Sequence, residues 1–260
     1  MQRKKAIYGL IGFPLGHSFS QTYFNQKFES EAIDASYENF EIEDIGELME
    51  IFAEFPELSG LNVTIPYKQQ VIPYMNEMDA VAAEIGAVNV IKIIRGKNGD
   101  FKLKGYNSDI IGFSDSIAPL IKPHHKKALV LGTGGASKAI MLGLKNLGLE
   151  PTLVSRTPKD GVLTYEQLDK DVMDSHTVIV NTTPLGMYPN VENAPDIPYN
   201  LLGENHLSYD LIYNPDETEF MKRSKAAGAT VKNGLEMLLL QAFASWNIWN
   251  EYDRTIRVYC

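Results

Sequence analysis

The chain has 260 residues, of which 44% are hydrophobic, and a formal net charge of −9. This length accommodates two small domains or one large one, no apolar run approaches the roughly 20 residues of a membrane span, and the acidic balance argues against nucleic acid as the main partner. Cys260 is the only cysteine, which excludes an intramolecular disulfide, and the five histidines show no metal-ligand spacing. We therefore expect a cytoplasmic protein that binds no metal, no nucleic acid and no membrane.

The N-terminal segment predicts alternating strands and helices. Ala6–Ile11 and Ala35–Phe40 have strand composition, and a helix lies between them. Ser20 fits the N-cap of that helix. Two hydroxyls at Ser18 and Ser20, at the start of a helix, can also converge on a carboxylate. The apolar face of the helix is expected to contain Tyr23, Phe24, the stem of Lys27, and Phe28.

A cation follows the third predicted strand. Ile45–Phe52 has helical spacing, Leu61–Ile65 is strand-like and ends at Pro66, and Lys68 is expected to open the next helix. A cation at that end is unusual because the helix dipole disfavours it, so Lys68 is either a solvated surface residue or a functional one. Ala80–Ile85 predicts a further short helix.

A hairpin closes this part of the chain. The predicted strands are Val88–Ile94 and Phe101–Tyr106, and Asn98-Gly99 between them is a strong turn signal. Ser108–Ile117 predicts a helix. Asp109 in its first turn either complements the helix dipole or contributes to a site. His124-His125, farther on, has the composition of a solvated connector.

The segment from residue 126 to 148 predicts half of a dinucleotide-binding unit. Ala128–Leu131 has the composition of a strand buried on both faces, and Gly132–Ala136 forms a glycine turn before a helix that ends at Gly148. Such a turn lets the backbone approach a pyrophosphate, and the helix N-terminus favours an anion. Ser137 occupies the third glycine position of the G-x-G-x-x-G pattern, so the motif alone allows a nucleotide site or a bare connector.

The next strand indicates which cofactor would bind. Thr152–Ser155 is followed by Arg156, and no carboxylate occurs before Asp160. An acidic residue at this place would select NAD, whereas a cation suits the 2′-phosphate of NADP. The following stretch is too short for an ordinary helix before Tyr165–Val172, which is helix-like. We therefore predict a trimmed nucleotide domain in which Val162-Leu163 adds at most a short edge strand.

The C-terminal part completes the alternation of strands and helices. The expected strands are Thr177–Asn181, Leu207–Tyr213 and Thr230-Val231, and the expected helices are Thr218–Ala227 and Glu236–Trp249. The last helix is long and apolar. Gln241 is its one polar residue between Met237 and Ser245, and this placement indicates a site.

Taken in order, several motifs resemble the shikimate dehydrogenase family from end to end. They are GFPLGHSFS, NVTIPYK, GAVN, GYNSDIIG, GTGGAS, SRT, NTTPLGM and GLEMLLLQA. The chain departs from the family pattern at several positions, none of which removes a group that does chemistry. Gln21 replaces a proline, Phe24 a histidine, Val90 a threonine and Ser155 an asparagine, and Thr133 and Lys138 differ from the usual loop residues.

The resemblance implies an α/β fold with two domains. An N-terminal α/β substrate domain would comprise residues 1–105 plus 238–260, because the C-terminal helix returns to it, and a Rossmann-like dinucleotide-binding domain would comprise 106–237. The implied activity is the reversible NADPH-dependent reduction of 3-dehydroshikimate to shikimate, which belongs to chorismate and aromatic amino acid biosynthesis. NADP would be the cofactor, and the protein would be a monomer or a homodimer.

The resemblance also implies a role for each matching residue. Lys68 and Asp109 would be catalytic. The substrate would contact Ser18, Ser20, Thr64, Asn89, Tyr213 and Gln241. The cofactor would contact Gly132, Thr133, Gly134, Gly135, Ala136, Ser155, Arg156, Thr157, Ile212 and Gly234.

Three alternatives remain open at this point. A quinate/shikimate dehydrogenase of broader specificity would use the same groups. A non-catalytic nucleotide-sensing relative would be expected to lose Lys68 or Asp109, and both are present. An unrelated two-domain dehydrogenase acting on a folate or an amino acid would have no use for the paired hydroxyls of Ser18 and Ser20.

Overall fold

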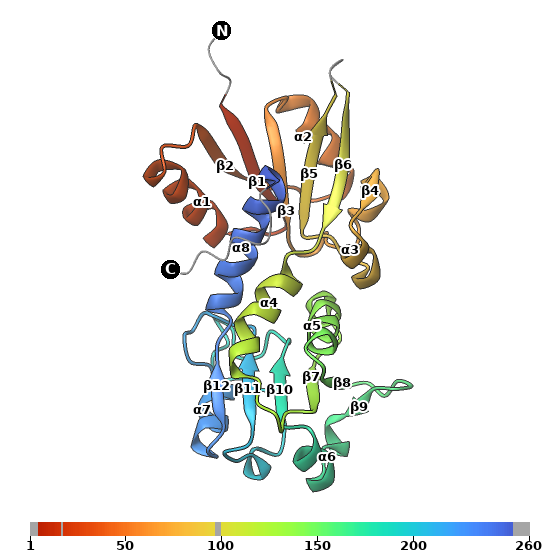
Figure 1. Cartoon of the computed structure of the whole chain (residues 1–260), viewed down its shortest axis with the longest axis vertical. Coiled ribbons are helices and arrows are strands. Elements are labelled where there is room, and N and C mark those ends of the chain that lie inside the picture. Colours follow the sequence, from red (N-terminus) through yellow and green to blue (C-terminus); the bar gives the residue numbers. More distant parts are fainter. Residues whose placement is uncertain (1–4, 17, 97–99, 252–260) are drawn as a thin grey trace. The chain divides into compact units, whose positions relative to one another are not determined.

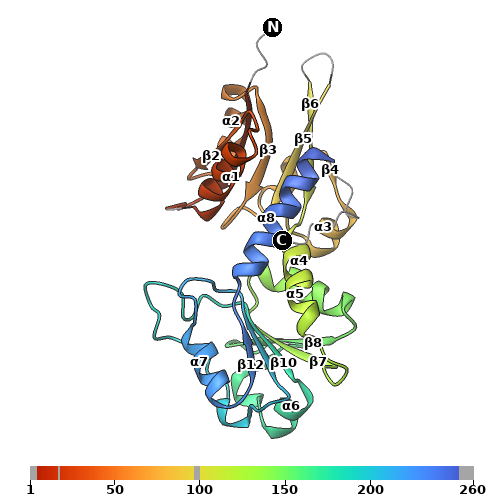
Figure 2. The ribbon, with the colours of Figure 1, turned by 60° about the vertical axis from the view of Figure 1, so that its left-hand side comes forward.

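A computed structural model of the chain describes residues 5–16, 18–96 and 100–251. The chain forms two units (Figures 1 and 2). The first ends at Ser108 and resumes at Ala242, and the second comprises Asp109–Gln241. The predicted Asn98-Gly99 turn lies outside the described residues, as do His17 and Cys260.

The first unit contains a mixed sheet with the strand order β2-β1-β3-β5-β6-β4. β1, β2 and β3 run parallel, whereas β5 is antiparallel to both β3 and β6, which confirms the predicted hairpin. The strands are β1 Ala6–Gly12, β2 Ala35–Glu41, β3 Leu58–Val63, β4 Glu77–Met78, β5 Val90–Arg95 and β6 Phe101–Tyr106. The helices are α1 Phe19–Ser30, α2 Leu48–Glu54 and α3 Ala80–Ile85, and 3₁₀ turns lie at Ile45–Glu47 and Ile72–Tyr74.

Each face of this sheet has its own core, because successive side chains of a strand point to opposite faces. Tyr8 and Leu10 of β1 belong to a cluster with Phe24 of α1 and with Trp246 and Trp249 near the C-terminus. On the other face, Ile11 and β3 pack with Leu48, Ile51 and Phe52 of α2. The C-terminal helix α8 (Leu235–Asn250) thus supplies part of the first unit's core.

The second unit is a parallel sheet with the strand order β12-β11-β10-β7-β8-β9, the arrangement of a Rossmann-like domain. The strands are β7 Lys127–Leu131, β8 Glu150–Ser155, β9 Leu163–Thr164, β10 Val178–Asn181, β11 Leu207–Asp210 and β12 Thr230–Lys232. The helices are α4 Asp109–Ile117, α5 Gly135–Asn146, α6 Lys170–Ser175 and α7 Glu219–Ala226. Further 3₁₀ turns lie at Ala118–Leu120, Tyr165–Gln167 and Tyr199–Leu201.

The central strand of this sheet is buried on both faces, as its composition predicted. Val130 belongs to the core beneath α4 and α5, and Leu131 belongs to the core beneath α6 and α7. Both side chains are fully buried. The α/β fold class with two domains expected from the sequence is therefore confirmed.

Three local predictions were wrong. No helix begins at Lys68, which lies in a turn between β3 and the 3₁₀ turn Ile72–Tyr74. The run Tyr165–Val172 divides into a 3₁₀ turn and the start of α6, because Asp169 caps a new helix. The strand expected over Leu207–Tyr213 ends at Asp210.

The predicted solvated connector at His124-His125 was wrong for His125, which is buried, whereas His124 is exposed. Its Nδ1 accepts a hydrogen bond from the Lys122 N–H at 3.0 Å, so its Nε2 carries the hydrogen and donates to the Asn205 carbonyl at 3.2 Å. His206 is held in the same way, between the Gly203 N–H and the Met173 carbonyl. Both rings are fixed by backbone contacts.

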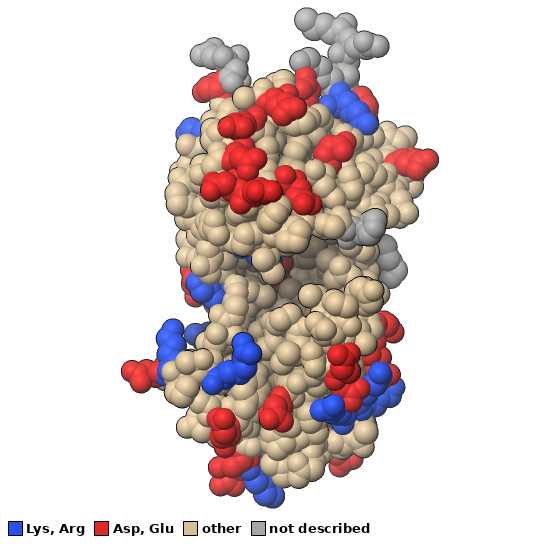
Figure 3. Space-filling model, turned by 180° about the vertical axis from the view of Figure 1, so that it is seen from behind, with Lys and Arg blue, Asp and Glu red and all other residues tan. Residues whose placement is uncertain are grey.

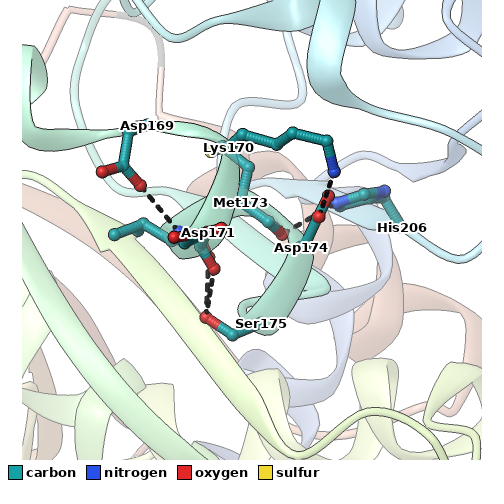
Figure 4. A network of polar contacts seen from close by, with 8 residues as sticks. Asp169, Lys170, Asp171, Met173, Asp174, Ser175 and His206 are labelled. Carbon is teal, nitrogen blue, oxygen red and sulfur yellow. Dashed lines mark hydrogen bonds and ion pairs between the residues drawn. The ribbon is translucent and has the colours of Figure 1, made fainter.

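Figure 4 shows the polar contacts of α6, to which His206 is joined through the Met173 carbonyl. Asp169, the N-cap of α6, accepts from the Val172 N–H at 2.9 Å, and Lys170 pairs with Asp174.

In the part of the chain that the structure describes, no group of three His, Cys, Asp or Glu side chains is placed to hold a metal ion. The helices described there are also too short or too polar to cross a membrane.

Candidate active site

The substrate-site residues predicted in the first unit converge because four chain segments meet at one edge of its sheet. β1 and β3 are parallel and end side by side at Ile11 and Val63. β5 starts at Val90 opposite Asn62, and β6 ends at its partner Tyr106. The segments that carry Ser18, Thr64, Asn89 and Ser108 therefore leave the sheet at the same edge.

The two predicted serines have different local roles. Ser18, not Ser20, is the N-cap of α1, and its Oγ accepts from the Gln21 N–H at 3.3 Å. The expected cap at Ser20 was therefore wrong. Ser20 lies in the first turn of α1, where its hydroxyl lies close to that of Tyr37. Both serines are half-buried.

Lys68 is tied to the segment that carries Asn89. The Lys68 carbonyl accepts from the Val88 N–H at 2.7 Å, and the Asn89 carbonyl accepts from the Val63 N–H at 2.9 Å. The Thr64 N–H donates to the Ile11 carbonyl at 2.9 Å. A half-buried ammonium, a hydroxyl and an amide thus come from three loops that share backbone hydrogen bonds.

The glycine turn of the second unit provides an open anion-binding surface. Gly132 has φ +104°, which favours glycine, and Gly134 is the N-cap of α5, so the cap residue has no side chain to accept from the first N–H groups of the helix. A Cβ built on Gly134 or Gly135 would meet no atom within 4 Å. The free N–H groups at the helix N-terminus and the open space above them fit the pyrophosphate of a dinucleotide.

The end of β8 carries an exposed cation. Arg156 forms no salt bridge with the residues that the structure describes, and Ser155 Oγ accepts from the Thr157 N–H at 3.1 Å, which shapes the turn. No helix lies between Arg156 and Tyr165, so the prediction of a trimmed nucleotide domain is confirmed. The chain instead forms a narrow loop, with a bridge between Lys159 and Val162, that leads into the short edge strand β9.

The predicted residues near the C-terminal end of the second unit also come together. A Cβ on Gly234 would lie 2.0 Å from the Leu211 carbonyl oxygen, so this close approach requires glycine, and the Gly234 N–H donates to the Ile212 carbonyl. Gly112 allows α4 to contact α8, since a Cβ there would lie 2.9 Å from the Gln241 nitrogen. Asp109, one turn earlier on α4, is only 8% exposed.

Tyr213 is 40% exposed, close after the end of β11. Lys68 belongs to the first unit and Asp109 to the second, and their pairing stays a prediction.

Sequence reasoning missed a buried carboxyl group that shapes this end of the sheet. Asp210 Oδ1 accepts from Asn181 Nδ2 and from the Ile212 N–H, each at 3.0 Å, and its Oδ2 accepts from Thr218 Oγ1 at 2.6 Å. Burial raises the pKa of Asp210 to about 6 against these hydrogen bonds. An acidic residue inside the apolar run Leu207–Ile212 was the signal that could have revealed it.

Figure 3 shows where charge gathers on one face of the molecule: acidic side chains cluster on the unit that contains the N-terminal sheet, and both signs mix on the other unit. The charged side chains are therefore unevenly distributed on that face, and cations are available on the unit that carries Arg156.

The model of the shikimate dehydrogenase substrate binding domain matches residues 10–91, which lie in the first unit. The shikimate dehydrogenase (NADP(+)) of Methanosphaera stadtmanae is 37% identical over 265 residues, covering 95% of this chain and 92% of that protein. The enzyme of the same name from Aquifex aeolicus is 37% identical over 255 residues, covering 94% and 91%.

Solved structures agree with these relatives. The crystal structure of shikimate dehydrogenase from Aquifex aeolicus matches with a TM-score of 0.82 at 36% identity, covering 97% of this chain and 95% of that one. The shikimate 5-dehydrogenase of Thermus thermophilus, in complex with NADP(H) and shikimate, matches with a TM-score of 0.81 at 28% identity, covering 95% and 94%. The resemblance in the motifs thus extends over both units, and the chain belongs to the shikimate dehydrogenase family.

Proposed function

We propose that this protein catalyses the reversible NADPH-dependent reduction of 3-dehydroshikimate to shikimate. The observation that carries the proposal is that the segments bearing Thr64, Lys68 and Asn89 meet at one edge of the sheet and are joined by backbone hydrogen bonds. A hydroxyl, an ammonium and an amide suit a small ring that carries several hydroxyls, and the family relationship identifies the ring as shikimate. The first unit would then be the substrate domain.

The substrate carboxylate would lie at the N-terminus of α1. Ser18 and Ser20 present hydroxyls there, and the helix N-terminus adds a partial positive charge. Because Ser18 Oγ accepts from the Gln21 N–H, its own hydrogen is directed away from that contact and can be donated to an anion. Thr64 and Asn89, with Tyr213 and Gln241 of the other unit, would contact the ring hydroxyls.

Lys68 is the proposed proton donor. Reduction of the ring ketone places negative charge on its oxygen, which requires a nearby acid, and an ammonium on a loop held by the Val88 N–H can supply it. Asp109 would orient that ammonium and accept from a substrate hydroxyl. NADP supplies the hydride chemistry when it is bound.

The second unit would hold the cofactor. Gly132, Thr133, Gly134, Gly135 and Ala136 would bind the pyrophosphate through backbone N–H groups, and Ile212 and Gly234 would line the nicotinamide end. Arg156 would bind the 2′-phosphate, with Ser155 and Thr157 shaping the turn. The 2′-phosphate contact is charge-assisted, and such hydrogen bonds are stronger than neutral ones.

A kinetic comparison tests the proposal. The change in NADPH absorbance is followed with shikimate and with quinate, each with NADP and with NAD. The expected result is fastest turnover with shikimate and NADP. Comparable turnover with quinate would favour the broader specificity, and no turnover with any pair would favour a nucleotide-sensing role. The cytoplasmic location and the choice between monomer and homodimer stay predictions of the sequence.

A further inference from the structure

A network of buried polar side chains crosses the core of the first unit beneath the proposed substrate site. Tyr37 Oη donates to Asn62 Oδ1 at 2.8 Å, and Asn62 Nδ2 donates to Ser245 Oγ at 2.9 Å. Ser245 Oγ lies 3.2 Å from Ser108 Oγ, which accepts from Asn89 Nδ2 at 3.1 Å. All five side chains are at least nine-tenths buried.

The orientation of Asn62 follows from its partners. Its Nδ2 also lies 3.2 Å from the Asn89 carbonyl, and a carbonyl can only accept. The amide nitrogen therefore faces Asn89 and Ser245, and the amide oxygen faces Tyr37. The Tyr37 hydroxyl also lies close to the Ser20 hydroxyl, so the network extends from Asn89 toward a second residue proposed to contact the substrate.

Ser245 joins the two halves of this network, because it contacts both Asn62 and Ser108. It lies on α8 among apolar neighbours, since Ala242, Trp246 and Trp249 pack in the core between α8 and the sheet. A buried hydroxyl costs free energy unless it is hydrogen-bonded, so a serine here must be matched by Asn62 and Ser108. Ser108 then fixes Asn89 twice, because its N–H also donates to Asn89 Oδ1 at 2.7 Å.

We propose that Ser245 is a positioning residue for the substrate site, which acts through Ser108 on the Asn89 side chain and through Asn62 on the Asn89 backbone, so that the side chain is held in place for a ring hydroxyl. The substrate part of this inference rests on the proposed function. Ser245 itself would not contact the substrate. Its loss would leave Asn89 less well fixed, and binding of the substrate would then have to order that side chain.

The first test needs no substrate. Hydrogen exchange of the Ser108 N–H reports its bond to Asn89, and it is measured in the wild type, in Ser245→Ala and in Ser116→Ala. Ser116 is a matched control because it is a buried, hydrogen-bonded helical serine in the other unit, where it contacts Tyr209 Oη at 2.6 Å. We expect Ser245→Ala to speed exchange at Ser108 about tenfold or more relative to this control. Unchanged exchange would overturn the proposal.

The second test measures the consequence for shikimate. Ser245→Ala is expected to raise the KM for shikimate about 3- to 10-fold, the range that corresponds to one net hydrogen bond, with little change in the KM for NADP. In an Asn89→Ala background the same substitution should have no further effect on that KM. Additive effects, or a lower melting temperature with an unchanged KM, would overturn the positioning role.

The two proposals fail in different ways. A wild-type protein without shikimate turnover contradicts the proposed function, and exchange at Ser108 then still decides whether Ser245 holds Asn89. Ser245→Cys provides a rescue test, because a thiol is a slightly larger replacement for the hydroxyl that keeps a weak hydrogen bond. Its exchange rate and KM should lie between those of the wild type and Ser245→Ala, and values equal to those of Ser245→Ala would contradict a role for the hydrogen bond.

Discussion

The buried carboxyl group of Asp210 makes stability depend on pH in a specific direction. Burial raises its pKa from 3.8 to about 6, because removal from water penalises the charged form. An acid whose pKa is raised by folding favours the folded state only while it is neutral. The unfolded chain ionises Asp210 from about pH 4, and the folded protein from about pH 6, so its contribution to stability is lost as the pH rises through this interval.

The size of the effect follows from the shift. About two pKa units at about 1.4 kcal/mol each amount to about 3 kcal/mol over the whole interval. Asp210→Asn removes the titration and keeps the shape. Its oxygen can still accept from Asn181 and from the Ile212 N–H, and its amide can donate to the Thr218 hydroxyl, which can accept.

Urea unfolding followed by circular dichroism measures this directly. Between about pH 4.5 and about pH 7.5, Asp210→Asn should gain about 2 kcal/mol of unfolding free energy relative to the wild type. Asp174→Asn on α6 of the same unit is the control for the loss of a carboxylate that is exposed, since this side chain is 53% exposed. The reasoning would be refuted if the unfolding free energies of Asp210→Asn and the wild type differed by the same amount at both pH values.

Three further predictions concern catalysis and the cofactor. Lys68→Ala should lower kcat by about 10²- to 10⁴-fold with a smaller change in shikimate binding, whereas Lys102→Ala, at an exposed lysine of β6, should leave kcat unchanged. Near wild-type turnover by Lys68→Ala would exclude Lys68 as the proton donor. Arg156→Ala should weaken NADP binding by about 1.5–3 kcal/mol and leave the use of NAD nearly unchanged, and Arg223→Ala on α7 is the control for the loss of an arginine elsewhere on this unit. Equal losses with both cofactors would contradict a contact between Arg156 and the 2′-phosphate. Because the trimmed domain leaves the cofactor more dependent on charge, NADP affinity in a calorimetric titration should fall steeply with added salt, and indifference to salt would contradict this.

Local patterns predicted the elements that local interactions determine. The apolar run, the glycine turn and the amphipathic helix around Gly132 fix one another within a few residues, and so do the strands of the hairpin. The trimmed stretch after Arg156 was also predictable, because chain length alone excluded a helix there.

Long-range contacts explain where the predictions failed. The turn at Lys68 is held by the buried Tyr67, whose hydroxyl donates to the Ile42 carbonyl at 2.6 Å, and by the Val88 N–H. Ser20 lies inside the first turn of α1, close to Tyr37 of the next strand, and Ser18 caps the helix instead.

The same limit applies to the candidate site. Its chemical groups could be named from motifs, but the residues that hold them in place could not. Asn62 and Ser245 form a hydrogen bond across 183 positions of the sequence, and no periodicity reports such a pair. Asp210 ends β11 earlier than its apolar run indicated, because its carboxylate accepts from the Ile212 N–H and turns the backbone there.

The most direct test of the proposed reaction follows the transferred hydrogen itself. The protein is incubated with 3-dehydroshikimate and NADPH that carries deuterium at both positions of nicotinamide C4, and the product is examined by mass spectrometry and NMR. The account predicts shikimate with one deuterium on the ring carbon that bears the new hydroxyl, formed about 10²- to 10⁴-fold more slowly by Lys68→Ala. Unchanged 3-dehydroshikimate, or shikimate without deuterium, would contradict it.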